Sequence, residues 1–275
     1  MYKLLITDLD DTLYSWTRFY IPAFYAMAEA VSDMTGIDLK RLLDEYRSVH
    51  QEKETVEYPF ATLYLPSIRD FYAGKTDPEL KEILQPAFSV FNRIRTERLR
   101  LFPGVRDTLM QLTEKGVRII GFTDSGELNG FYRLQLLGIS HLFCRVYVSN
   151  YEYPGSDPIS RDSCIRKVVN GKPDPELLLQ ILDEEDLDRS DAIYAGDSLT
   201  KDILMAYDAG VTSIQCSYPS EANMTEYEQK LIRISSWTEE IFRKEAELRM
   251  RCEREQIRPD YIITDFRDIF DIICR

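Results

Sequence analysis

The stretch LLITDLDDT, residues 4–12, carries the strongest indication of the fold. Its apolar and β-branched residues predict a buried strand over 3–7, and two carboxylates, Asp8 and Asp10, follow where that strand ends. Acidic residues are common at the ends of parallel strands, so this pattern alone does not establish a functional site. Its meaning depends on the rest of the chain.

Short apolar runs with β-branched residues recur along the sequence. They lie at 3–7, 117–122, 142–148, 192–195, 211–216 and 261–264, and helices are expected between several of them, at 105–115, 127–137, 175–182 and 199–209. This alternation predicts an α/β protein with a Rossmann-like parallel β-sheet flanked by helices. In such sheets, ligands bind beyond the carboxyl ends of the strands.

One long segment interrupts the alternation. Between about residues 14 and 98 only helical patterns occur, at 22–34, 39–50, 66–72 and 78–96. We therefore expect a catalytic core of residues 1–14 and 99–275 and an inserted all-helical cap domain of residues 15–98. Residues 153–158, YPGSDP, are expected to form an extended surface loop. The segment 225–258 carries Glu and Arg or Lys residues four apart, which is typical of an exposed helix, with docking to a partner as the alternative.

Composition limits the classes of function. The formal charge of −13 over 275 residues disfavours a nucleic-acid polymer as partner, because phosphate backbones select basic surfaces. No apolar stretch approaches 18 residues, so neither a membrane span nor a signal peptide is expected. Five cysteines without CxxC spacing favour reduced thiols in a cytoplasmic protein. The two histidines, His50 and His141, are expected to be structural or solvated.

Three further polar elements follow strands or open helices. Thr123 ends the strand at 117–122, Lys172 lies in GKPDP before a helix, and GDSLTKD at 196–202 carries Asp197 and Asp202. Each has an ordinary structural explanation, such as a strand-end hydroxyl, a solvated loop charge or a helix N-cap. Because all are expected at one edge of one sheet, together they indicate a single site.

Phosphoryl transfer explains this set of residues. A carboxylate attacks a phosphate dianion poorly because both are negative, and a divalent cation between them removes that barrier. Mg²⁺ prefers oxygen ligands, which Asp8 and Asp197 can supply. Lys172 and Thr123 can bind the other phosphoryl oxygens, and Asp10 is placed to act as acid and base if Asp8 is the nucleophile.

These motifs resemble the haloacid dehalogenase superfamily of phosphohydrolases, and the resemblance spans essentially the whole chain. It implies that Asp8 is the nucleophile and Asp10 the acid and base, and that Thr123, Lys172 and the backbone N–H of Asp124 bind the phosphoryl group. It also implies a Mg²⁺ ion held by Asp8, the backbone carbonyl of Asp10, and Asp197, with Asp202 in support. The dehalogenating branch lacks the second acid of DxD, so Asp10 favours phosphate esters.

The expected activity is therefore Mg²⁺-dependent hydrolysis of a small phosphate monoester through a phospho-aspartate. The substrate stays open between a nucleoside monophosphate, whose base the aromatic residues of the cap could stack, and a sugar phosphate. Alternatives are a phosphotransferase or mutase of the same fold, a phospho-accepting signalling switch, and a catalytically silent binding protein. The oligomeric state is not predicted.

Overall fold

A computed structural model describes residues 1–58, 60–150, 164–218 and 224–275, so the loop expected at 153–158 lies outside the described residues. The chain divides into two compact units. The first comprises Met1–Ser15, Arg100–Pro219 and Lys244–Arg275, and the second comprises Trp16–Leu99 and Ser220–Arg243. The second unit thus includes a segment that the sequence analysis assigned to the core.

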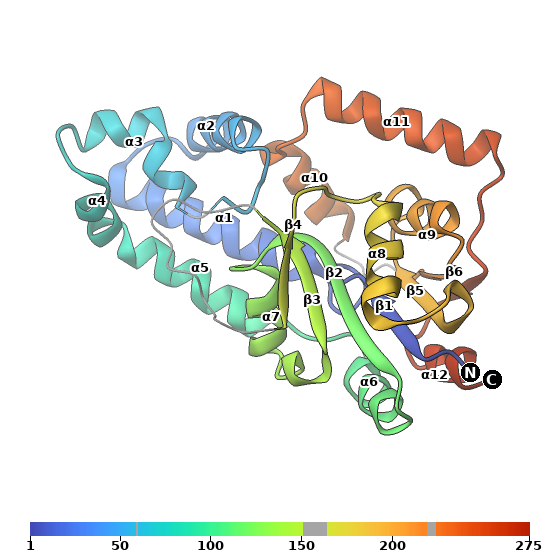
Figure 1. Ribbon diagram of the computed structural model, residues 1–275. Coiled ribbons are helices and arrows are strands. Elements are labelled where there is room, and N and C mark those ends of the chain that lie inside the picture. The colour runs from blue at the N-terminus through green and yellow to red at the C-terminus, as the bar shows by residue number, and fades with distance from the viewer. Residues whose placement is uncertain (59, 151–163, 219–223) are drawn as a thin grey trace. The chain divides into compact units, whose positions relative to one another are not determined.

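Among the described residues, seven strands form one sheet in the first unit, in the order β4-β3-β2-β1-β5-β6-β7, and every neighbouring pair is parallel (Figure 1). The strands are β1 (Leu4–Thr7), β2 (Arg118–Gly126), β3 (Arg145–Ser149), β4 (Ile165–Val168), β5 (Ala192–Gly196), β6 (Thr212–Cys216) and β7 (Tyr261–Ile263). The predicted α/β fold with a Rossmann-like parallel sheet is confirmed. Strand β4 was not predicted, because its sequence, IRKV, is half charged.

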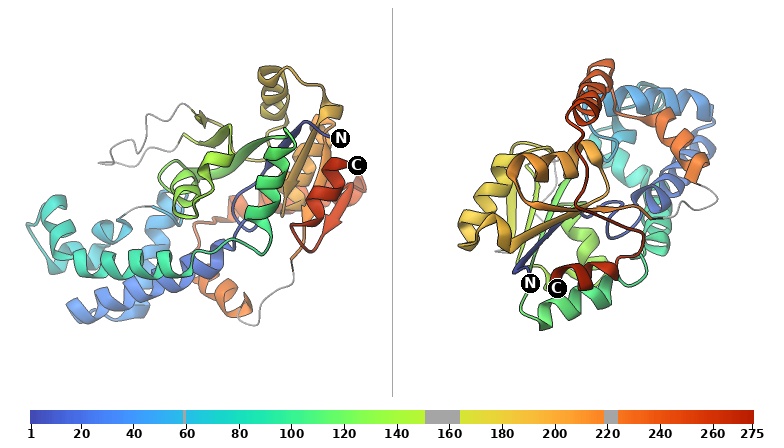
Figure 2. Two further views of the ribbon diagram at one scale, coloured as in Figure 1. Left: turned by 90° about the horizontal axis from the view of Figure 1, so that it is seen from below. Right: turned by 90° about the vertical axis from the view of Figure 1, so that its right-hand side faces the viewer.

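Helices cover both faces of this sheet (Figure 2). One face packs against α8 (Pro175–Glu185) and α9 (Leu204–Ala209), with Leu4, Ile6 and Phe122 in the shared apolar core. Helices α6 (Val105–Glu114), α7 (Gly130–Leu136) and α12 (Asp268–Cys274) lie on the other face. The shorter elements are η2 (Ser140–Leu142), η3 (Arg189–Asp191) and η4 (Leu199–Ile203), the last a π-helical turn that continues into α9.

The position of β1 in the sheet decides where the site forms. Strand β1 lies between β2 and β5. Strands β2, β3 and β4 follow on one side of β1, and the chain then crosses to the other side to form β5, β6 and β7. Thr7 at the end of β1 is level with Gly121 of β2 and Ala195 of β5. This point, where the strand order reverses, is the place at which open α/β sheets bind their ligands.

The second unit is helical. It contains α1 (Trp16–Thr35), α2 (Leu39–Glu52), η1 (Ala61–Tyr64), α3 (Pro66–Phe71), α4 (Asp77–Ile83), α5 (Gln85–Arg98) and α10 (Met224–Ile234). Its core is rich in rings: Phe24 of α1 packs on Tyr46 and His50 of α2, with ring centroids 4.8 and 5.5 Å apart. All three side chains are buried, as expected for residues of a packed helical domain.

The segment expected as one charged helix over 225–258 is two helices with different partners. Helix α10 packs against α1 and α2 of the second unit, and Ile234 at its end is fully buried. Helix α11 (Glu239–Arg254) begins in the second unit and ends in the first, where Cys252 is buried against Ile203. Among the described residues, no helix is both long and apolar enough to cross a membrane.

Candidate active site

The first unit brings the predicted site residues together at the carboxyl ends of β2, β1 and β5. Asp8 directly follows β1, and its N–H donates to the Ala195 carbonyl at 2.8 Å, which keeps it in line with the sheet. Thr123 and Asp124 lie in the last part of β2, and Asp197 directly follows β5. The geometry therefore follows from strand order and register.

A lysine–carboxylate cluster forms the centre of this site. The Nζ atom of Lys172 lies 2.5 Å from Asp8 Oδ1 and 2.8 Å from Asp202 Oδ1. The Lys172 side chain is 3% exposed, so its charge is compensated by these carboxylates rather than by water. Burial acts to lower the pKa of Lys172, but Asp202 and Asp8 outweigh burial and raise the pKa well above its usual range. Lys172 is therefore a fixed cation.

Asp202 is held by the π-helical turn that follows β5. Its Oδ1 accepts the Tyr194 hydroxyl at 2.8 Å, and its Oδ2 accepts the Ser198 backbone N–H at 3.0 Å. Gly196 makes room for it, because a Cβ atom at Gly196 would lie 2.4 Å from Asp202 Cγ. The glycine of GDSLTKD thus allows the chain to approach its own buried carboxylate.

The acidic side chains fit a hard divalent cation. Oxygens of Asp8, Asp197 and Asp202 all lie within 4.8 Å of one another. Burial and the surrounding carboxylates raise the pKa of Asp197 to about 7, and burial raises the pKa of Asp8 despite Lys172. When all three carboxylates are ionised they exceed the charge of Lys172 by two, with Asp8 and Asp202 buried and Asp197 more open to solvent. An all-oxygen donor set with that excess suits Mg²⁺.

Asp10 lies beside this cluster with a different set of partners. Its Oδ1 accepts from Arg133 NH1 at 2.7 Å, and its Oδ2 accepts from the Ser125 hydroxyl at 3.0 Å and the Thr123 hydroxyl at 3.4 Å. The Ser125 backbone N–H donates to Thr123 Oγ1 at 3.0 Å. The carboxylate of Asp10 is not one of the three grouped carboxylates, and its expected backbone ligation stays a prediction.

The side chain of Asp124 links the end of β2 to the loop at Lys172 and to η4. Its Oδ1 accepts the Lys172 backbone N–H at 2.9 Å, and its Oδ2 accepts Lys201 Nζ at 2.8 Å. Burial opposes the charged form, but Lys201 and Lys172 outweigh it and lower the pKa of Asp124. An ionised Asp124 therefore fixes the backbone at Lys172. The expected contact of its N–H with phosphate stays a prediction.

Sequence reasoning did not single out four residues of this neighbourhood: Ser125, Arg133, Tyr194 and Lys201. Lys201 lies inside the motif GDSLTKD and Ser125 directly follows Asp124, so their positions could have suggested a role. Tyr194 was counted as one apolar residue of a strand. Arg133 lies ten residues after Thr123, on a helix whose sequence gives no sign that this arginine is buried.

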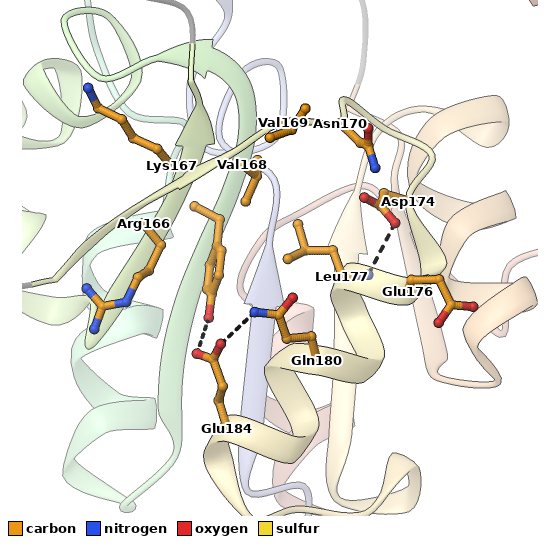
Figure 3. A pocket seen from close by; sticks show the side chains of 11 residues that line it. Arg166, Lys167, Val168, Val169, Asn170, Asp174, Glu176, Leu177, Gln180 and Glu184 are labelled. Carbon is orange, nitrogen blue, oxygen red and sulfur yellow. Dashed lines mark hydrogen bonds between the residues drawn. The ribbon is translucent and has the colours of Figure 1, made fainter.

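A cavity of about 440 Å³ lies elsewhere in the first unit (Figure 3). Residues of β3, β4 and α8 and the segment after β4 line it, among them Tyr147, Arg166 and Glu184. Glu184 accepts the Tyr147 hydroxyl at 2.9 Å and the Gln180 amide at 2.8 Å, and both bonds are drawn in Figure 3. None of the seven candidate site residues lines this cavity, although Asn170 and Asp174, on either side of Lys172 in the sequence, do.

Comparison with known proteins agrees with this geometry. A haloacid dehalogenase-like hydrolase family model matches residues 2–210. The chain is 26% identical over 217 residues to a glyceraldehyde 3-phosphate phosphatase of Methanopyrus kandleri, covering 78% of this chain and 84% of that protein. It is 25% identical over 219 residues to the protein of the same name from Methanocaldococcus jannaschii, covering 78% of this chain and 85% of that protein.

A solved structure supports the fold. The 2-haloacid dehalogenase of Pseudomonas syringae pv. Tomato DC3000 superposes with a TM-score of 0.59 at 22% identity, covering 100% of this chain and 99% of that one. The family and the named relatives support the expectation of a hydrolase that acts on phosphoric monoesters. With its motif-bearing strand ends gathered around Lys172, the chain belongs to the haloacid dehalogenase-like hydrolase family.

Proposed function

We propose that this protein is a Mg²⁺-dependent phosphatase that hydrolyses a small phosphate monoester through a phospho-aspartate at Asp8. The observation that carries the proposal is the buried cluster in which Lys172 contacts Asp8 and Asp202 while Asp197 completes a group of oxygens within 4.8 Å. A nucleophile, a fixed cation and a cation site thus meet at one point. Asp8, Asp197 and Asp202 would hold the Mg²⁺, which would lower the charge repulsion between carboxylate and phosphate.

The first chemical step forms a bond between an Asp8 oxygen and phosphorus and breaks the bond from phosphorus to the ester oxygen. Lys172 and Thr123 bind phosphoryl oxygens, where charge is held in the transition state. Asp10 gives its proton to the leaving oxygen. In the second step Asp10 takes a proton from water, the water oxygen bonds to phosphorus, and the bond to Asp8 breaks to release phosphate.

The proposed substrate class is a small phosphorylated sugar, of which glyceraldehyde 3-phosphate is the first to test. Two relatives that share about a quarter of their residues with this chain carry that substrate in their names. A nucleoside monophosphate is the second candidate, favoured only by the aromatic content of residues 15–98. A cytoplasmic location stays a prediction, supported by five free cysteines, all of them among the described residues.

A phosphate-release assay tests the proposal. The wild-type protein is incubated with Mg²⁺ and a panel of p-nitrophenyl phosphate, glyceraldehyde 3-phosphate, other sugar phosphates and nucleoside monophosphates, with Asp8→Asn as the blank. We expect release that stops on chelation and falls by at least about 10³-fold in the blank. A signalling switch would release almost nothing, and a mutase would convert a sugar phosphate to its isomer without free phosphate.

A further inference from the structure

Arg133 is a buried cation whose place in the chemistry no motif assigns. Its side chain is 3% exposed, and its NH1 lies 2.7 Å from Asp10 Oδ1. A buried guanidinium is costly unless a charge compensates it, and the ion pair with Asp10 provides that compensation. The contact lies in the first unit, at the same strand ends as Asp8.

The fold brings Arg133 to this position through a close approach of α7 to β2. Helix α7 begins at Gly130, where a Cβ atom would lie 2.8 Å from Thr123 Cγ2. A larger residue would therefore push the helix away from the end of the strand. Arg133 stands three residues after Gly130, on the same face of the helix, which directs it towards Thr123 and Asp10.

The two oxygens of Asp10 are not equivalent in this arrangement. Oδ1 receives the guanidinium, whose N–H groups can only donate, so a proton on the Oδ1 lone pair facing Arg133 is excluded. Oδ2 accepts from the hydroxyls of Ser125 at 3.0 Å and Thr123 at 3.4 Å, and a hydroxyl can accept as well as donate. Oδ2 is thus the oxygen that can carry and pass on a proton beside the proposed phosphate-binding threonine.

We propose that Arg133 is a positioning residue that holds Oδ1 of Asp10, so that Oδ2 exchanges the proton with the leaving oxygen and with water. This inference rests on the proposed function. Arg133 does not touch the reacting atoms; it restricts the Asp10 carboxylate to one orientation. Because the geometry of general acid catalysis must be correct within hydrogen-bond reach, a freely turning carboxylate would serve the leaving oxygen poorly.

The dependence of rate on the leaving group separates this role from simple structural support. An alkyl phosphate releases a strongly basic alkoxide that needs a proton, whereas p-nitrophenolate leaves without one. We compare kcat and KM for p-nitrophenyl phosphate with those for the alkyl phosphate that the wild type hydrolyses fastest. The variants are Arg133→Met, Arg133→Gln, Arg133→Lys and the benchmark Asp10→Asn.

The matched control is Arg118→Met. Arg118 also pairs with a buried carboxylate, Glu185, but it begins β2 and therefore lies at the opposite end of that strand. Melting curves establish that each variant is folded, and if Arg133→Met does not fold, Arg133→Gln and Arg133→Lys decide the question because they keep a polar donor. Wild-type activity on either ester establishes the proposed function separately.

In Arg133→Met we expect kcat to fall more for the alkyl ester than for p-nitrophenyl phosphate, by an additional factor of about ten or more. Asp10→Asn should show a difference between the two esters in the same direction. Arg133→Lys should recover part of that difference, and Arg118→Met should show none. Equal losses on both esters, no loss, or a rise in KM with unchanged kcat would overturn the inference. A wild type that hydrolyses neither ester would instead refute the proposed function.

Discussion

At the scale of single residues, the site is a balance of buried charges. Lys172 contacts the carboxylates of Asp8 and Asp202, and Arg133 contacts that of Asp10. The positions of Asp8, Thr123, Lys172, Asp197 and Asp202 could be predicted because each follows from a strand end or a loop before a helix. The position of Arg133 could not, because one arginine on a short helix looks the same in sequence whether it is exposed or buried.

Replacing Lys172 by Met should lower kcat/KM by about 10²- to 10³-fold, because the fixed cation proposed to bind phosphoryl charge is lost. The measurement is steady-state kinetics with p-nitrophenyl phosphate and Mg²⁺. Lys3→Met is the control, since Lys3 pairs with Asp191 before β1 begins and its side chain is 61% exposed. Equal kinetics in wild type and Lys172→Met would refute the role of this lysine.

At the scale of elements, local sequence patterns identified most strands and helices but not their partners. Strand β4 was missed because Arg166 and Lys167 give it no apolar character, although it pairs with β3 over four residues. Helix α10 was expected to be solvated, yet it is part of the second unit. Its charge pattern could not reveal this, because the same spacing of charges is found on solvated helices, whereas here Arg233 pairs with Asp44 of α2 and two backbone carbonyls accept hydrogen bonds from α1 and α2.

His50 joins α2 to the end of α10. Its Nδ1 donates to the Ile234 carbonyl at 2.7 Å, which makes Nε2 an acceptor, and that buried atom has no hydrogen-bond partner among the described residues. Burial is the main cause that lowers the pKa of His50 to about 4. The neutral ring is therefore the form that the folded unit holds.

Stability should fall as the pH drops from about 6.5 towards about 4, because the unfolded chain then binds a proton at His50 that the folded unit excludes. The full effect is about 3 kcal/mol below both pKa values. Denaturant unfolding at several pH values measures it. His50→Asn keeps a donor near the Ile234 carbonyl but cannot titrate, so its stability should depend less on pH. The same slope in both proteins would contradict this account.

At the scale of the whole molecule, the net charge of −13 poses a problem for any enzyme that binds an anion. The proposed answer is local: Lys172 lies buried at the strand ends, and a Mg²⁺ ion held by Asp8, Asp197 and Asp202 would offset the excess of carboxylates. Fold class, helical insertion and family were all predictable, because strand–helix alternation and ordered motifs are long-range patterns of the sequence. The assignment of 220–243 to the second unit was not, because it depends on packing between distant segments.

Mg²⁺ should stabilise the protein more at high pH than at low pH. Without a cation, burial and neighbouring carboxylates raise the pKa of Asp197 to about 7, so the folded state retains a proton that the unfolded state has lost above about pH 4. Stability of the metal-free protein should therefore decline as the pH rises from about 4 to about 7. Mg²⁺ binding displaces that proton and should raise Tm strongly at pH 8 and little at pH 5.

Thermal melting with and without Mg²⁺ at the two pH values checks this prediction. Asp197→Asn should be more stable than the wild type without metal at pH 8 and should respond weakly to Mg²⁺. A Mg²⁺ response that is as large at pH 5 as at pH 8 would contradict a site whose carboxylates must lose protons to bind the ion.

The covalent step at Asp8 is tested most directly by trapping it. Asp10→Asn is mixed with substrate and Mg²⁺, quenched in acid within the first turnover, digested and analysed by mass spectrometry. Because this variant lacks the base for the second step, we predict that the peptide containing Asp8 gains the mass of one phosphoryl group and that Asp8→Asn never does. Release of phosphate by the wild type, with no phosphorylated Asp8 peptide at any time in either protein, would contradict the account.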